Sequence, residues 1–180
     1  KAKEGGKNRY VMCTALMKEK VTEAMMLTNG LYRAYERNEF YLLYQPQVCS
    51  QTGEIKGVEA LIRWNHPELG IIPPSRFIPL AEQTGIIISI GEWILRTACM
   101  QNMKWRSAGL PGIRMAVNLS LQQLQNHGID SVVEDVLSET GMDTEWLELE
   151  VTESIAMKES HEVTDTLNAF KKQGIAIAID

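Results

Sequence analysis

The sequence predicts an α/β protein in which helices pack on a parallel sheet. Strand-like runs alternate with helix-like runs along most of its 180 residues, and glycines end several of the helix-like runs. Strands that alternate with helices pair in parallel, because each helix carries the chain back to the same end of the sheet. An open doubly wound sheet and a closed barrel share this alternation, so periodicity alone does not choose between them.

Composition is typical of a soluble globular protein. Hydrophobic residues make up 44% of the chain and charged residues 23%. The net charge of -5 gives no basic surface for a nucleic-acid polymer. The longest apolar stretch, near residues 85–90, is too short to insert across a membrane. Cys13, Cys49 and Cys99 lack metal-site spacing and indicate reduced thiols in a cytoplasmic protein.

The expected elements follow one another without internal repeats. Helices are expected at 19–37, 75–83, 88–107, 131–141 and 160–172, and strands at 41–48, 55–64, 113–119, 146–151 and 175–179. The leading helix has Leu27, Leu31 and Ala34 at helical spacing. The first two strands are aromatic, apolar and β-branched runs separated by a polar turn. Glycines and a proline in the loop after residue 107 end the long helix.

The second half of the chain continues the alternation with three shorter strands. Ser131, followed three residues later by Glu134, forms a capping-box pattern at the start of the fourth helix. The last helix carries Val163, Leu167 and Phe170 on one face. A glycine closes this helix before the final strand.

Oxygen-bearing side chains recur at similar places in the predicted strands. They are Glu59, Asn118, Glu150 and Asp180. The carboxyl ends of parallel strands meet at one rim, where carboxylates and an amide would suit Mg²⁺ or Mn²⁺. Other readings remain open: Glu59 could be solvated, Asn118 and Asp180 could cap helices. Glu148 shares a strand face with Glu150, so periodicity does not say which would bind a metal.

Longer runs around these residues carry a resemblance. Residues 57–64 read Gly-Val-Glu-Ala-Leu-Ile-Arg-Trp, and residues 73–82 read Pro-Pro-Ser-Arg-Phe-Ile-Pro-Leu-Ala-Glu. Val-Asn-Leu-Ser, Leu-Glu-Val-Thr-Glu-Ser and Ile-Ala-Ile-Asp then follow in order around Asn118, Glu150 and Asp180. From about residue 31 to residue 180, the chain resembles the EAL domain family. Residues 3–10 resemble the end of a GGDEF domain, a diguanylate cyclase module.

The resemblance implies an architecture and a division of the chain. Residues 1–18 would be a GGDEF remnant and linker, and residues 19–180 the N-terminal part of an EAL domain. EAL domains are TIM-type (β/α) barrels whose first strand is antiparallel. A barrel of this type needs roughly 250 residues. We therefore expect a partial barrel, truncated after about five strands.

The resemblance also implies a phosphodiesterase that opens cyclic di-GMP to linear pGpG with two Mg²⁺ or Mn²⁺ ions. Glu59, Asn118, Glu150 and Asp180 match the metal ligands, and the three carboxylates among them also count as catalytic. Gln45 and Arg63 match substrate contacts, with Arg63 at a phosphate. A guanidinium suits this anion because its fork donates two hydrogen bonds. Glu153 matches a glutamate that braces a loop over the site.

In the family, a second aspartate, a Phe-Gly-Thr-Gly loop, a lysine, a glutamate and a glutamine follow the position of Asp180. We therefore expect the parent domain to be an enzyme and the isolated chain to be inactive and poorly stable, with an unpaired sheet edge. The alternative is a catalytically inactive EAL domain that acts as a cyclic di-GMP receptor or interaction module. The expected setting is cytoplasmic, with homodimerisation of the full-length protein through its EAL domain. Whether that protein is membrane-anchored is left open.

Overall fold

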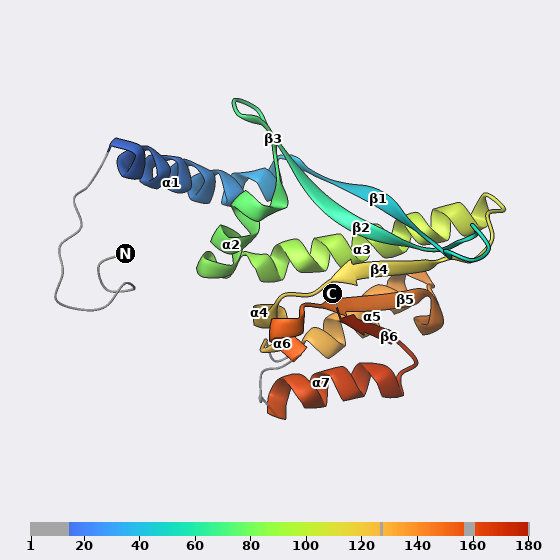
Figure 1. The fold of residues 1–180 in the computed structure, drawn as a ribbon. Coiled ribbons are helices and arrows are strands. Elements are labelled where there is room, and N and C mark those ends of the chain that lie inside the picture. The colour runs from blue at the N-terminus through green and yellow to red at the C-terminus, as the bar shows by residue number, and fades with distance from the viewer. Residues whose placement is uncertain (1–14, 127, 157–160, 180) are drawn as a thin grey trace.

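The computed structural model describes residues 15–126, 128–156 and 161–179 (Figure 1). The strands are β1 Phe40–Val48, β2 Ile55–His66, β3 Gly70–Ile72, β4 Arg114–Asn118, β5 Leu147–Val151 and β6 Ala176–Ile179. The helices are α1 Ala15–Glu36, α2 Pro74–Thr84, α3 Ile87–Ser107, α4 Leu121–Leu124, α5 Ile129–Thr140, α6 Glu153–Ala156 and α7 His161–Lys172, with a 3₁₀ turn η1 at Thr144–Trp146.

All described strands belong to one sheet in the order β1-β2-β4-β5-β6, with β3 attached to β2. β1 runs antiparallel to β2, and Gln45 lies opposite Glu59. β2, β4, β5 and β6 are mutually parallel, with helices on each connection between them. The predicted α/β architecture with an antiparallel first strand is therefore confirmed.

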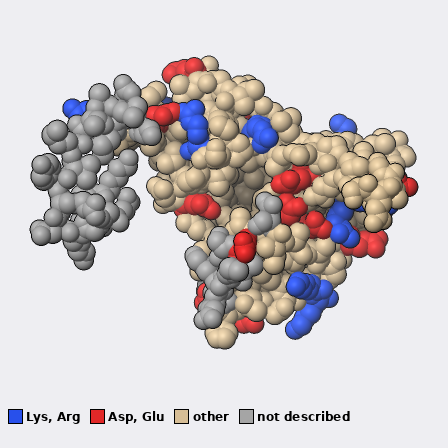
Figure 2. All heavy atoms as spheres, viewed as in Figure 1, with Lys and Arg blue, Asp and Glu red and all other residues tan. Residues whose placement is uncertain are grey.

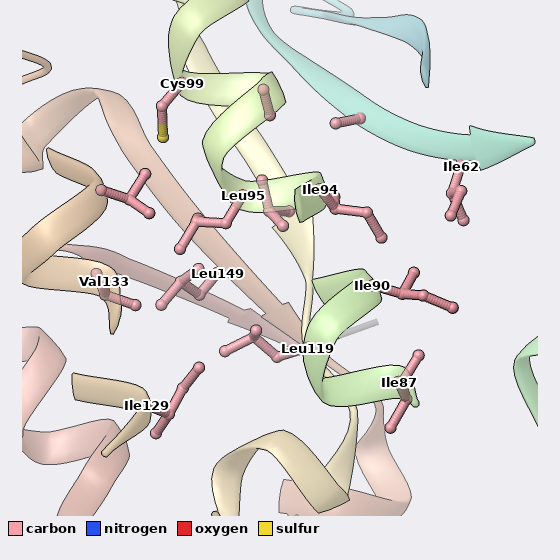
Figure 3. Close-up of a cluster of buried hydrophobic side chains, with 14 of the residues drawn as sticks. Ile62, Ile87, Ile90, Ile94, Leu95, Cys99, Leu119, Ile129, Val133 and Leu149 are labelled. Atoms are coloured by element: carbon pink, nitrogen blue, oxygen red, sulfur yellow. The ribbon is translucent and has the colours of Figure 1, made fainter. Parts of the chain in front are cut away.

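The core fills the space between the sheet and its helices. Alternate residues of β2, from Val58 to Trp64, are buried, as are Leu147, Leu149 and Val151 of β5. Figure 3 shows the side chains of α3 between Ile62 of β2 on one side and Leu149 and Val133 on the other. Because side chains of a strand alternate between faces, the remaining residues point away from the helices.

We call this second face the inner face. Its residues are Leu43, Gln45 and Gln47 of β1, Glu59, Leu61 and Arg63 of β2, Ala116 and Asn118 of β4, and Glu148 and Glu150 of β5. The predicted site residues on the described strands all belong to it. The alternation of buried and polar residues in these strands thus separates the core from the candidate site.

An aromatic cluster fixes the entry of the leading helix into the domain. The Trp64 ring lies 5.8 Å from Phe40 and 5.6 Å from Phe77, centroid to centroid. The Trp64 indole Nε1 donates a hydrogen bond of 2.9 Å to Glu39 Oε2. Gly30 of α1 lets the helix approach this ring, because a Cβ there would lie 3.0 Å from Trp64. The cluster ties α1 and α2 to the far end of β2.

Two local predictions differ from the structure. The loop expected after residue 64 contains β3, because His66 Nδ1 accepts hydrogen bonds from the amides of Glu68 and Leu69 and Gly70 takes a positive φ of 68°. These contacts close a tight hairpin.

The capping box predicted at Ser131 and Glu134 is wrong. α5 begins at Ile129, after Gly128 with φ 110°, so Ser131 already lies inside the first turn. A capping box forms instead at Ser120 and Gln123, which start the unpredicted helix α4. Ser120 qualifies because it leaves β4 in an extended conformation, as an N-cap residue must.

The predicted GGDEF remnant falls on residues 1–14, which lie outside the described residues, and on the start of α1. α1 already includes Ala15, ahead of the predicted start at position 19. Within the described part of the chain, no helix has the length and apolar content needed to cross a membrane.

Candidate functional site

The centre of the candidate site lies on neighbouring strands of the inner face. Asn118 is the last residue of β4 and pairs in register with Glu150 of β5. The Asn118 side-chain Nδ2 donates a hydrogen bond of 2.7 Å to Glu59 Oε1 on β2. Parallel pairing brings these residues together, although 59 positions separate Glu59 from Asn118 in the chain. The structure therefore brings three of the four predicted side chains onto neighbouring strands of one face.

Glu150 has the most enclosed carboxylate of the group. Glu150 is 7% exposed, and its Oε1 accepts a hydrogen bond of 3.1 Å from Gln47 Nε2. A buried carboxylate is costly unless hydrogen bonds or a cation compensate its charge. Its position beside Asn118 and its burial distinguish Glu150 from the other glutamate of β5.

Glu148 occupies a different environment on the same strand. It lies opposite Ala116, two residues further than Glu150 from the carboxyl end of β5. Its Oε2 accepts a hydrogen bond of 2.9 Å from Arg114 Nη1, forming an ion pair. The carboxylate is thus neutralised by a side chain of β4. This pairing favours Glu150 over Glu148 as a candidate metal ligand.

The predicted substrate contacts lie on β1 and further along β2. Gln45 is exposed and lies opposite Glu59. Arg63 is on the inner face but about 13 Å further along β2, at the usual rise per residue. Its Nη1 donates a hydrogen bond of 2.8 Å to the carbonyl oxygen of Ile62. The structure therefore brings Gln45 to the carboxylates, while Arg63 lies apart from them.

The remaining predicted residues are placed only in part. Glu153 is exposed and opens the short helix α6 directly after β5. Asp180 lies outside the described residues. The position of Glu153 puts it at the carboxyl end of β5, on the same rim as Asn118.

A cavity of about 800 Å³ opens at this rim. Its lining includes Leu61, Ile78, Ile87, Asn118, Ser120 and Thr152. Figure 2 shows a hollow in the middle of the molecular face with acidic side chains around it. Mostly apolar walls with a few polar groups are typical of sites for small organic ligands. The sequence singled out Asn118 but missed these walls, although Ile78 lies in the run that carried the family resemblance.

The donor chemistry fits a hard divalent cation. The converging side chains offer only carboxylate and amide oxygens as ligands, which suits Mg²⁺ or Mn²⁺ better than softer metals. Among the described residues, no group of three His, Cys, Asp or Glu side chains gathers closely enough to hold a metal ion. Among the described residues, the candidate ligands are therefore Glu59, Asn118 and Glu150, with only two carboxylates.

A family model of the EAL domain matches residues 28–180. The chain belongs to the EAL domain family. The match includes every strand of the sheet and all the site residues described above.

Relatives of this EAL domain include proteins named as phosphodiesterases. It is 40% identical over 179 residues to the bifunctional diguanylate cyclase/cyclic di-GMP phosphodiesterase MucR of Pseudomonas aeruginosa, which covers 99% of the chain and 26% of MucR. It is 34% identical over 179 residues to the cyclic di-GMP phosphodiesterase PdeR of Escherichia coli, covering 99% of the chain and 27% of PdeR. The chain thus spans about a quarter of the length of these curated relatives.

The solved structures agree with this membership. The MucR phosphodiesterase in complex with cyclic di-GMP superposes with a TM-score of 0.83 and 41% identity, over 86% of this chain and 63% of that one. Structural neighbours of the chain are EAL domains of the TIM-barrel type, which confirms the predicted fold family.

Proposed function

We propose that this EAL domain hydrolyses one phosphodiester bond of cyclic di-GMP to give linear pGpG. One arrangement carries the proposal: Asn118 donates a hydrogen bond of 2.7 Å to Glu59, pairs in register with Glu150, and lines the 800 Å³ cavity. The names of MucR and PdeR support the same reaction. The activity, substrate and partners of the whole protein belong to this proposal.

Within the proposal, Glu59, Asn118 and Glu150 hold Mg²⁺ or Mn²⁺ together with Asp180. A bound divalent cation would supply charge stabilisation for the phosphodiester and lower the pKa of a coordinated water. The carboxylates of Glu59 and Glu150 offset the cation charge. Asn118 contributes its amide oxygen, because its Nδ2 already donates to Glu59.

Charged, polar and apolar side chains would together orient the substrate. Arg63 would leave its contact with the Ile62 carbonyl and donate to a phosphate oxygen, a stronger charge-assisted hydrogen bond. Gln45 would contact the substrate beside Glu59, and the apolar wall near Leu61 and Ile78 would pack against a base. Glu153 would brace a loop over the site.

The cellular setting stays a prediction of the same proposal. The domain would bind cyclic di-GMP in the cytoplasm, and it would form a homodimer contact in the full-length protein. Neither statement is needed for the chemistry.

The test compares the 180-residue chain with the gene product that carries this sequence. Cyclic di-GMP is incubated with Mn²⁺ or Mg²⁺, and pGpG is quantified chromatographically, with EDTA as the metal-free control. We expect turnover by the gene product, loss of turnover in EDTA, and little or none by the isolated chain. Clear turnover by the isolated chain would refute the expectation that it is inactive.

The alternative function is separated by a binding measurement on the same samples. Cyclic di-GMP binding without pGpG formation would favour a receptor over an enzyme. If the gene product shows no binding and no turnover, both functions are overturned.

A further inference from the structure

We infer that Gln47 is a positioning residue that orients the Glu150 carboxylate for its metal. The inference rests on the proposed function, in which Glu150 is a metal ligand. Its starting point is the hydrogen bond of 3.1 Å from Gln47 Nε2 to Glu150 Oε1, which joins residues 103 positions apart. Gln47 belongs to β1 and Glu150 to β5.

This contact crosses the inner face of the sheet. β1 and β5 are separated by β2 and β4, a path of about 14 Å along a flat sheet at the usual strand spacing. A glutamine side chain cannot span that path, so the sheet must curl until β1 and β5 approach each other across its inner face. Gln47 therefore connects the two ends of the curved sheet at the level of the candidate site.

Gly57 provides the space that this crossing needs. It lies opposite Gln47 in the β1–β2 register. A Cβ at Gly57 would lie 2.7 Å from Gln47 Oε1, closer than side chains tolerate. The amide of Gln47 thus passes directly over the backbone of Gly57. A side chain at position 57 would therefore force the Gln47 amide to shift.

The chemistry of the donor suits a metal ligand. Glu150 is 7% exposed, so its carboxylate needs hydrogen-bond donors as well as a cation. An amide donates a hydrogen bond without adding positive charge, so this contact does not neutralise the carboxylate. Glu148 shows the contrast, because its partner Arg114 neutralises it. Donors that orient metal-binding carboxylates in this way typically affect metal affinity by roughly 10- to 100-fold.

The test measures Mn²⁺ affinity by electron paramagnetic resonance in the gene product that carries this sequence. Gln47→Leu removes the donor and keeps a similar volume. We expect it to raise the dissociation constant roughly 10- to 100-fold. Gln51→Leu changes an exposed glutamine in the turn of the same hairpin and should leave the constant unchanged.

A kinetic measurement distinguishes positioning from a general structural role. In Gln47→Leu, the Mn²⁺ concentration needed for half-maximal hydrolysis should rise, while kcat at saturating Mn²⁺ stays within about threefold of the unsubstituted protein. A fall in kcat that saturating Mn²⁺ does not restore would overturn the inference. If Gln47→Leu does not fold, Gln47→Met provides a second apolar replacement for the same comparison.

Glu150→Gln separates failure of the inference from failure of the proposed function. If Glu150→Gln weakens Mn²⁺ binding and Gln47→Leu does not, the inference is wrong and the proposed function stands. If Glu150→Gln leaves Mn²⁺ binding unchanged, the ligand assignment in the proposed function is wrong and the inference falls with it.

Discussion

The Nδ2 atom of Asn118 lies 2.7 Å from Oε1 of Glu59, across neighbouring parallel strands of the inner face. Asn118→Leu removes both the donor to Glu59 and the amide oxygen proposed for the metal. We expect the rate of cyclic di-GMP hydrolysis to fall at least roughly tenfold, in line with the loss of a metal ligand or its support. Initial rates over a range of Mn²⁺ concentrations measure the effect.

Asn118→Asp is the informative companion. It keeps an oxygen ligand but places a carboxylate against Glu59, so the two repel until a cation binds. Activity should return at raised Mn²⁺ concentration, unlike in Asn118→Leu. Equal rates for both variants at every Mn²⁺ concentration would contradict a metal role for Asn118.

Glu148 and Glu150 should respond differently to the same change. Glu150→Gln removes the charge of a 7% exposed carboxylate beside Asn118, so Mn²⁺ affinity should fall at least roughly tenfold. Glu148→Gln breaks an ion pair with Arg114 that is exposed on the arginine side, so affinity should stay within about threefold. Isothermal titration with Mn²⁺ compares the two, and a larger effect at Glu148 would reverse the assignment.

Gly91→Ala should destabilise the fold although alanine is the better helix former. Gly91 lies in α3, and a Cβ there would lie 1.9 Å from Nε2 of Gln123. Gln123 is 3% exposed and accepts hydrogen bonds from the amide and hydroxyl of Ser120. The helix-propensity gain of about 1 kcal/mol is outweighed by overpacking and loss of the cap. We expect a net loss of about 1–3 kcal/mol in the free energy of unfolding, measured in urea.

The partner substitution isolates the cause. In a Gln123→Ala background the clash is absent, so Gly91→Ala should cost much less or become stabilising. Additive effects of the two substitutions would show that Gln123 is not what Gly91 accommodates.

Cys49 should be the more reactive of the two described thiols near neutral pH. The pKa of Cys49 is lowered to about 7, first by the Thr52 side-chain hydroxyl and then by the backbone amides of the turn. Burial raises the pKa of Cys99 to about 12. A lowered pKa means that the reactive thiolate of Cys49 forms as pH rises through about 7, whereas Cys99 stays protonated and enclosed.

Iodoacetamide labelling between about pH 6 and 9, resolved by site with mass spectrometry, measures the Cys49 titration. Thr52→Val should move its midpoint upward, toward the usual thiol value of about 8.5. Rates near neutral pH should then fall, and rates well above both midpoints should converge. An unchanged midpoint in Thr52→Val would exclude the hydroxyl as the cause.

Local patterns in the sequence were sufficient for most of the architecture. Alternating residues of β2 and β5 are buried because their side chains alternate between the helix-covered and inner faces. The same alternation of apolar and polar residues is visible in the sequence. The capping pattern at Ser131 misled because the turn before it, with Gly128 at positive φ, starts the helix earlier. The hairpin at β3 was missed because its closure depends on the His66 side chain, which accepts two backbone amides.

The sequence by itself determined the family, the strand order along the chain and the candidate ligands Glu59, Asn118 and Glu150, because these follow from short runs of neighbouring residues. Only the tertiary structure decided that Glu148 is paired with Arg114, that Gln47 reaches Glu150 over Gly57, and that a cavity opens beside Asn118. The reason is physical. These contacts depend on which strands are neighbours and on how far the sheet curls, and both are set by the packing of the whole domain.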